Sequence, residues 1–176
     1  MDSSKIILLG YMGSGKSIVG NQLAKTLSIK FIDLDRYIER AEGHNITEIF
    51  ESKGELYFRA QERKYLEVLL KDSLPMVLSL GGGTPCYYDT MEYIQSLENL
   101  TSFYLNTNIN TLVLRLLKEK ATRPLIAHLE NEDAVNEFIG KHLFERNRFY
   151  QQAHHQISTD QKSVETLVKD IKKKLS

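Results

Sequence analysis

The sequence predicts an α/β fold in which helices cover both faces of a five-stranded parallel sheet. Short apolar runs typical of buried strands alternate with stretches whose apolar residues recur every three or four positions, as in helices. Strands that alternate with helices form parallel sheets, because each connecting helix packs back onto the sheet. A glycine-rich turn at residues 10–17 follows the first run, and in α/β proteins such a turn leads from a strand into a helix.

The strand-like runs are short and mostly apolar. The first ends at Gly10, the second leads through two apolar residues to Asp33, and the third comes directly after Pro75. The five expected strands are residues 5–9, 30–34, 76–80, 102–105 and 156–158.

Helical periodicity fills the segments between these runs. Residues 18–27 carry an apolar stripe, and residues 36–70 continue the pattern with breaks near Gly43 and Gly54. Further helices are expected over 109–117, from 135 onward, and over 164–175.

The length of 176 residues predicts a single domain, residues 1–176, with a sizeable core. The segments between strands two and three and between strands four and five are too long for simple crossovers, and long insertions usually carry function. We expect the first, about 34–72, to build a substrate pocket. The second should hold a mobile lid over about 118–131.

The composition excludes several classes of protein. Lys plus Arg and Asp plus Glu both total 23, so the net charge is zero and a broad affinity for nucleic acid or anionic membrane is not expected. The single cysteine, Cys86, excludes an intrachain disulfide and a cysteine zinc cluster. No run approaches eighteen apolar residues, so no membrane span or secretion signal is expected. We expect a cytoplasmic monomer.

The turn at residues 10–17, Gly-Tyr-Met-Gly-Ser-Gly-Lys-Ser, fits the phosphate-binding P-loop pattern. Its glycines let backbone N–H groups face a phosphate chain, Lys16 can reach the terminal phosphates, and Ser17 offers a hydroxyl to Mg²⁺. A glycine-rich turn without a ligand is the alternative. A dinucleotide site is disfavoured, because Ile18 stands where the third glycine would be. The residues assigned to ATP in this segment are Gly13, Ser14, Gly15, Lys16, Ser17 and Ile18.

Two carboxylates stand at the end of the second strand. Asp33 and Asp35 are two residues apart, so on an extended segment both would face one side. One could serve hydrated magnesium, and the other could accept hydrogen bonds from substrate hydroxyls. The alternative is a helix start with Asp35 as a favourable N-terminal charge.

Three glycines, residues 81–83, follow the third strand directly. They suggest a ligand pressed against bare backbone, the alternative being a flexible turn. The strand before them has Ser79 where many P-loop proteins carry an Asp. Magnesium coordination would then rely on Ser17, Asp33, phosphates and water.

Three arginines are candidates for binding anions. Arg59 begins a helical segment, Arg146 lies on or beside a buried stripe, and Arg123 lies in the second insertion. Each alone could be a surface ion pair. Together with a P-loop they suggest a substrate carboxylate and a transferring phosphoryl group, which favours a small-molecule kinase over a switch or motor NTPase.

The chain resembles the shikimate kinase family along nearly all of its length. The P-loop is shared by many families, but the ordered set of the other motifs is specific. The matching motifs are residues 10–17, Asp33-Leu-Asp35 with Ile38-Glu39, residues 46–50, Gly54-Glu55, Phe58-Arg59 with Glu62, residues 80–83, Arg123-Pro-Leu125, and Glu145-Arg146 with Tyr150.

The resemblance implies a three-layer P-loop NTPase fold of the nucleoside-monophosphate-kinase type, with sheet order 2-3-1-4-5. It also implies ATP-dependent phosphorylation of the 3-hydroxyl of shikimate, on the route to chorismate and the aromatic amino acids. The expected partners are therefore ATP and shikimate, with Mg²⁺ as cofactor.

The resemblance also implies roles for single residues. Asp35 would bind substrate hydroxyls and help to activate the nucleophile. Shikimate binding is implied for Asp35, Arg59, Gly81, Gly82, Gly83 and Arg146, with both arginines on the carboxylate. Ser17 would ligate Mg²⁺, with Asp33 acting through its water. Lys16 and Arg123 would stabilise the transferring phosphoryl group.

Some positions depart from the family pattern. Ile18 replaces a Thr, Thr84-Pro85 replaces a small and aliphatic pair, and Arg148 stands where a Pro is common. Lys162, assigned to ATP, and Arg115 are the candidates for the basic residue at adenine.

Two alternatives remain open. One is another small-molecule kinase of the same fold, acting on gluconate or a nucleotide. The other is an NTP-binding module without transfer activity. Asp35, Arg59 and Arg146 argue against both, since together they supply hydroxyl and carboxylate recognition.

Overall fold

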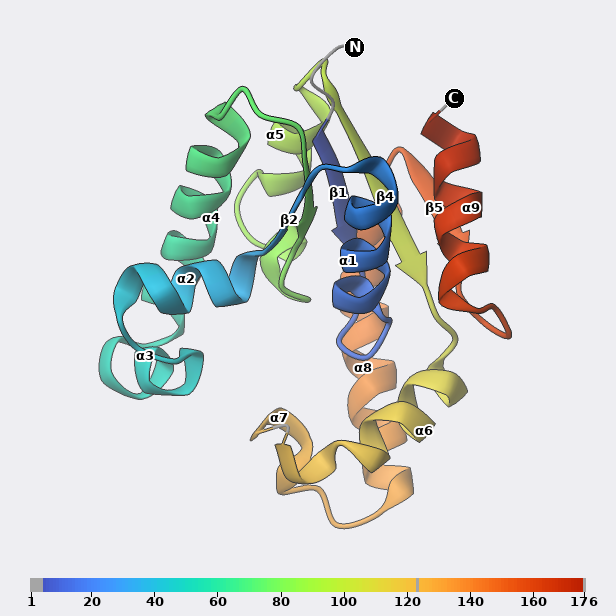
Figure 1. Ribbon diagram of the computed structural model, residues 1–176. Coiled ribbons are helices and arrows are strands. Elements are labelled where there is room, and N and C mark those ends of the chain that lie inside the picture. Colours follow the sequence, from blue (N-terminus) through green and yellow to red (C-terminus); the bar gives the residue numbers. More distant parts are fainter. Residues whose placement is uncertain (1–4, 123, 176) are drawn as a thin grey trace.

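The computed structural model describes residues 5–122 and 124–175 and has three layers, a parallel sheet between two layers of helices (Figure 1). The sheet order is β2-β3-β1-β4-β5, and every neighbouring pair is parallel. The strands are β1 (Lys5–Leu9), β2 (Lys30–Asp33), β3 (Met76–Ser79), β4 (Leu100–Asn106) and β5 (His155–Ser158). The fold class and strand order predicted from the sequence are confirmed.

The helices include each of those expected. The α-helices are α1 (Lys16–Leu27), α2 (Leu34–Glu42), α3 (Ile46–Lys53), α4 (Glu55–Lys71), α5 (Thr90–Gln95), α6 (Ile109–Lys118), α7 (Pro124–Ala127), α8 (Glu132–Tyr150) and α9 (Val164–Leu175). The 3-10 helices are η1 (Thr84–Cys86) and η2 (Lys120–Thr122). The sequence did not predict α5, α7, η1 or η2, since each is too short for a helical period to register.

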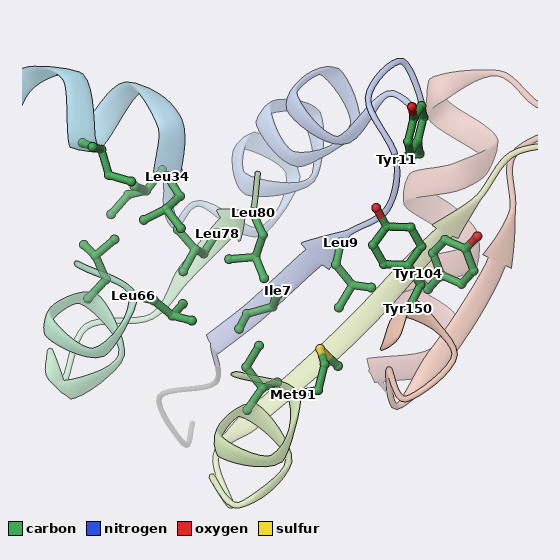
Figure 2. Packing of buried hydrophobic residues seen from close by; sticks show 14 of the residues in the cluster. Ile7, Leu9, Tyr11, Leu34, Leu66, Leu78, Leu80, Met91, Tyr104 and Tyr150 are labelled. Atoms are coloured by element: carbon green, nitrogen blue, oxygen red, sulfur yellow. The ribbon is translucent and has the colours of Figure 1, made fainter. Parts of the chain in front are cut away.

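Alternate residues of the central strand feed two separate cores. Ile7 and Leu9 point to the face covered by α2, α4, α5, α6 and α8, and part of that packing is seen in Figure 2. Ile6 and Leu8 point to the opposite face, which α1 and α9 cover. All four side chains are buried, because successive side chains of a strand point to opposite faces of the sheet and helices cover both faces.

Caps and glycines divide the insertion between β2 and β3 into three helices. Gly43 ends α2 with a left-handed backbone, φ 70°. Asn45 and Glu48 form a reciprocal capping box at the start of α3, and Gly54, φ 82°, separates α3 from α4. The breaks expected near Gly43 and Gly54 are confirmed.

The end of the second strand differs from the sequence expectation. The strand expected over residues 30–34 stops at Asp33, and Leu34 already begins α2. The Asp33 side chain accepts a hydrogen bond from the Arg36 backbone N–H (3.3 Å) and so caps the helix, while Leu34 is fully buried. The extended-strand reason for pairing Asp33 with Asp35 was therefore wrong, because Asp35 lies in the first turn of α2.

The segment expected to form a lid, residues 118–131, contains the end of α6, η2 and α7. Arg123, its proposed phosphoryl contact, lies outside the described residues. Among the helices of residues 5–122 and 124–175, none combines the length and apolar character needed to cross a membrane.

Candidate functional site

A cavity of about 450 Å³ lies along the phosphate loop, beyond the carboxyl ends of the strands. Asp33 and Asp35 line it together with Gly81 and Gly82, and Arg115 and Lys162 line it further along. Two other cavities, about 500 and 490 Å³, are lined by residues of α2 and its surroundings and include no phosphate-loop residue. The cavity of about 450 Å³ is therefore the candidate site, since it combines the phosphate loop with two carboxylates.

The phosphate loop has the backbone shape that its glycines allow. Gly13 (φ 79°) and Gly15 (φ 95°) are left-handed, and Gly15 caps α1. The Lys16 ammonium lies over the loop, where Nζ donates to the carbonyls of Gly10 (2.9 Å) and Tyr11 (3.0 Å). Loop amides, the N-terminus of α1 and a cation thus lie side by side, an arrangement that suits a phosphate chain.

Ser17 and Asp33 meet at the start of α1. The Ser17 hydroxyl donates to Asp33 Oδ2 at 2.8 Å. Both are hard oxygen donors, the chemistry that Mg²⁺ prefers, so these residues fit that ion. The described residues contain no cluster of three or more His, Cys, Asp or Glu that could hold a metal, so Mg²⁺ here would take most of its ligands from phosphates and water.

Asp35 is the most perturbed acid of the cavity. Burial, followed by the nearby charges of Glu62 and Asp33, raises the pKa of Asp35 to about 7. In the described part of the chain, no side chain or backbone group makes a hydrogen bond to its carboxylate. Despite the helical backbone, Asp33 and Asp35 do face one cavity, as expected from the sequence.

Crowding by the protein itself is one reason for the glycine run. A Cβ at Gly81 would lie 2.7 Å from Asp35 Oδ1 and 2.8 Å from Glu62 Oε1, and one at Gly83 would lie 2.6 Å from the Arg59 guanidinium. A Cβ at Gly82 would make only ordinary contacts. None of the three has a left-handed backbone, so close approach of side chains, rather than turn geometry, requires Gly81 and Gly83.

Arg59 is held by two carboxylates of its own helix. Its guanidinium donates to Glu62 (2.8 Å) and to Glu55 (3.2 Å), and it lies over the Tyr87 ring at 4.4 Å. Glu62 is almost fully buried and also accepts from the Thr84 hydroxyl at 2.5 Å. The charge of Arg59 is therefore largely offset within the protein.

Arg146 on α8 lies near Gly82, the middle residue of the glycine run. Its guanidinium nitrogen is 3.7 Å from the Cβ position of Gly82, and the group lies over the Tyr11 ring at 5.6 Å. No carboxylate of residues 5–122 or 124–175 forms an ion pair with it. The two arginines expected to share a carboxylate thus lie near adjacent glycines, Arg59 near Gly83 and Arg146 near Gly82, but of the two only Arg146 has no ion pair with a described carboxylate.

Two residues that support the site, Glu62 and Tyr150, appear in the sequence analysis only as parts of motifs. Glu62 had a further signal, because its spacing of three from Arg59 on a helix indicates an ion pair. Tyr150, whose hydroxyl donates to the Gly82 carbonyl at 2.6 Å, had no such signal. The two adenine candidates lie at the cavity, with Arg115 donating to the Gly13 carbonyl (3.0 Å) and Lys162 paired with Asp170 (2.8 Å).

Comparison with known proteins gives one consistent family. The family model described as shikimate kinase matches residues 12–176. Shikimate kinase from Flavobacterium johnsoniae is 44% identical over 95% of this chain and 96% of its own. Shikimate kinase from Flavobacterium psychrophilum is 41% identical over 96% of this chain and 97% of its own.

Solved structures agree with these matches. Shikimate kinase from Bacteroides thetaiotaomicron has a TM-score of 0.88 at 34% identity, covering 98% of both chains. Shikimate kinase from Acinetobacter baumannii, solved in complex with shikimate, has a TM-score of 0.84 at 33% identity, covering 98% of this chain and 92% of its own. A gluconokinase from Sinorhizobium meliloti, at 14% identity and a TM-score of 0.56, shares the fold alone.

Proposed function

The chain belongs to the shikimate kinase family, and from this membership we propose which of its residues carry out the ATP-dependent phosphorylation of shikimate. The reaction transfers the γ-phosphoryl group of ATP to the 3-hydroxyl of shikimate. Phosphoryl transfer of this kind requires positioning and charge neutralisation more than covalent chemistry by the protein.

Asp35 carries the assignment of the acceptor side. Its carboxylate lies in the same cavity as the phosphate loop, makes no hydrogen bond to the described residues, and has a pKa near 7. It binds the shikimate hydroxyls and accepts the proton of the attacking 3-hydroxyl. A base with a pKa near the working pH combines a useful ionised fraction with a strong tendency to take the proton.

The nucleotide side is formed by the loop and α1. The loop amides and Lys16 hold the phosphates, and Lys16 exchanges its carbonyl partners for phosphate oxygens as negative charge develops. Ser17 and Asp33 would hold Mg²⁺, which when bound neutralises charge on the phosphates. Arg123 completes this side from the lid at 118–131, and Lys162 or Arg115 contacts the base.

The shikimate carboxylate binds at the glycine run. Arg146 supplies the main charge because it has no carboxylate partner among the described residues, whereas Arg59 contributes from an ion pair with Glu62. The backbone of Gly82 faces the same space. The insertion at about 34–72 therefore contributes one arginine and Asp35, and α8 contributes the other arginine.

A panel of acceptors tests the proposal directly. ATP and Mg²⁺ are incubated with shikimate, gluconate, and a nucleoside monophosphate, and ADP release is followed. We expect turnover with shikimate alone. Turnover with gluconate alone would support the alternative kinase, and binding of ATP with no acceptor used would support the non-catalytic module.

The Lys16→Met variant separates catalysis from binding. The fold should be kept while the rate falls by about 100- to 1,000-fold or more, because a charge that stabilises the transition state is lost. A folded variant with a rate within tenfold of the parent would contradict the role of the loop lysine. The monomeric state and cytoplasmic location expected from the sequence remain proposals, and sedimentation of the purified protein tests the first.

A further inference from the structure

Glu42, the last residue of α2, is held by side chains from two other helices. Its Oε2 accepts from the Tyr57 hydroxyl (2.7 Å) and from Lys53 Nζ (3.2 Å), and its Oε1 accepts from the Tyr65 hydroxyl (2.8 Å). The Glu42 side chain is only 9% exposed. We call Glu42, Lys53, Tyr57 and Tyr65 the Glu42 clasp.

The position of Glu42 is unfavourable for α2 considered alone. A carboxylate at the C-terminus of a helix faces the negative end of the helix dipole, where Lys, Arg or His would be favoured. The hydrogen bonds from Tyr57 and then Tyr65 nevertheless lower the pKa of Glu42 to about 2, so the carboxylate stays ionised. The hydrogen bonds that stabilise the Glu42 carboxylate at this position therefore come from α3 and α4.

The clasp joins the helices that carry the acceptor site. Asp35 lies at the other end of α2, seven residues away, and Arg59 and Glu62 lie on α4 between the two tyrosines. The two carboxylate oxygens of Glu42 are therefore held by turns of α4 on either side of Arg59 and Glu62. This arrangement restrains both the distance between the two helices and the rotation of α4.

A second contact acts in the same direction. The Tyr65 ring packs edge-on against the Tyr37 ring of α2, with centroids 5.6 Å apart. Lys53 Nζ, at the end of α3, also lies 4.5 Å from the centre of the Tyr57 ring. The clasp thus combines ring packing with charged hydrogen bonds, and no member of it lines the cavity of the candidate site.

The expected influence on the site follows from the length of α2. Seven residues of helix span about 10 Å, so a tilt of about 6° around Glu42 moves Asp35 by about 1 Å. A misplacement of that size can reduce a rate by about 100-fold. A small change at the clasp therefore has a large effect at the far end of the helix.

We propose that Glu42 is a positioning residue, which sets Asp35 on α2 against Arg59 and Glu62 on α4 through its hydrogen bonds to Tyr57, Tyr65 and Lys53. The inference rests on the proposed function, because it takes Asp35 and Arg59 to bind shikimate and Glu62 to hold Arg59 in place. It adds a residue outside the cavity to the requirements for recognition of the acceptor.

The Glu42→Gln variant tests this role, because glutamine keeps the shape and removes the charge. We expect kcat/KM for shikimate to fall by about tenfold or more while the KM for ATP stays within about twofold. A role in stability alone would lower the active fraction, which reduces kcat and leaves both KM values unchanged, and that result would overturn the proposal.

Matched variants sharpen the test. Glu67→Gln removes a carboxylate that pairs with Arg63 inside α4, and it should leave shikimate kinetics unchanged. Tyr65→Phe removes one hydroxyl and remains informative if Glu42→Gln does not fold. The Glu42→Gln/Tyr65→Phe double variant should lose less than the product of the two single losses, since both changes break one interaction. Independent losses would count against the clasp.

The proposed function and the clasp are tested by different measurements. A turnover assay of the parent with ATP and shikimate tests the proposed function, and absence of turnover would refute it. Amide hydrogen exchange tests the clasp. Whether or not turnover occurs, Glu42→Gln should speed exchange in residues 34–42 and 55–65 more than in the strands. Unchanged exchange in those two helices would refute the clasp itself.

Discussion

Replacing Gly81 by alanine should damage both stability and catalysis, although nothing in its backbone geometry requires glycine. A Cβ there would lie 2.7 Å from Asp35 Oδ1, 2.8 Å from Glu62 Oε1 and 3.0 Å from Thr84 Oγ1. To restore ordinary contacts near 3.4 Å, these oxygens must retreat by about 0.4 to 0.7 Å. The Glu62 and Thr84 oxygens cannot move independently, because Glu62 accepts hydrogen bonds from both Thr84 and Arg59.

The size of the effect can be estimated from two opposing contributions. Forcing a methyl group into a packed site costs about 1–3 kcal/mol, and alanine recovers about 0.4–1 kcal/mol by restricting the unfolded chain. The net loss is then about 1–2 kcal/mol. For a chain of this length that corresponds to a fall in Tm of about 2–8 °C. Because Asp35 is one of the displaced groups, kcat should fall as well.

Gly82→Ala is the matched control, since its Cβ would lie 3.5 Å from the Met12 backbone nitrogen and 3.7 Å from Arg146. Its free energy of unfolding, measured by urea denaturation, should equal or slightly exceed that of the parent. Gly81→Ala should unfold at lower urea. If both variants were as stable as the parent and Gly81→Ala kept its kcat, crowding would not be the reason for glycine at that position.

The remaining predictions concern the charged groups. The folded-state pKa of Asp35, about 7, exceeds its unfolded value of about 3.9, so the parent loses stability as pH rises through this interval. Asp35→Asn should therefore have the same free energy of unfolding as the parent in urea near pH 4, and one that is a few kcal/mol higher near pH 8. Shikimate turnover should be lost. If the variant and the parent were equally stable at pH 8 as well as at pH 4, the raised pKa of Asp35 would be wrong. Arg146→Ala should raise the shikimate KM with little change in Tm. Arg59→Ala should raise the KM and also lower Tm, because it leaves Glu62 buried without its cation. Similar Tm values for the two variants would contradict the difference in their ion pairing. Ser17→Ala should raise the Mg²⁺ concentration needed for half-maximal rate, and an unchanged magnesium titration would remove Ser17 from the metal site.

The sequence was sufficient where the signals are local. The phosphate loop and the breaks at Gly43 and Gly54 each depend on a few adjacent residues, and all lie where expected. The sheet order came from the resemblance to a family, because pairing between distant strands has no short-range signature. The end of β2 was missed by one residue, since a capping aspartate and a strand residue look alike until the helix is seen.

Long-range packing accounts for what the sequence could not reveal at the site. Nothing near Gly81 in the chain announces that Asp35 and Glu62 crowd against it, so the glycine run was interpreted in terms of a ligand alone. The pairing of Arg59 with Glu62, three residues apart on one helix, is by contrast a local feature that helix spacing indicates. The contacts of Glu42 with Tyr57 and Tyr65 join residues 15 and 23 positions apart, beyond the reach of any periodicity argument.

The insertion that carries Asp35 and Arg59 leaves the sheet at the end of β2 and returns at β3, and these two strands are direct neighbours. Because these strands are parallel, the insertion leaves at the carboxyl end of the sheet and returns at its amino end, and its last helix, α4, packs in the core through Leu66, Leu69 and Leu70. A shortened or exchanged insertion must keep that crossing. The phosphate loop follows β1, on the other side of β3, and is untouched by such an exchange. Donor recognition therefore stays with the loop after β1, while acceptor recognition is divided between this insertion and α8, which carries Arg146. Grafting a different insertion between β2 and β3 would change the contacts to the acceptor hydroxyls and keep Arg146, so it would redirect the same phosphoryl-transfer machinery to another alcohol that carries an anionic group.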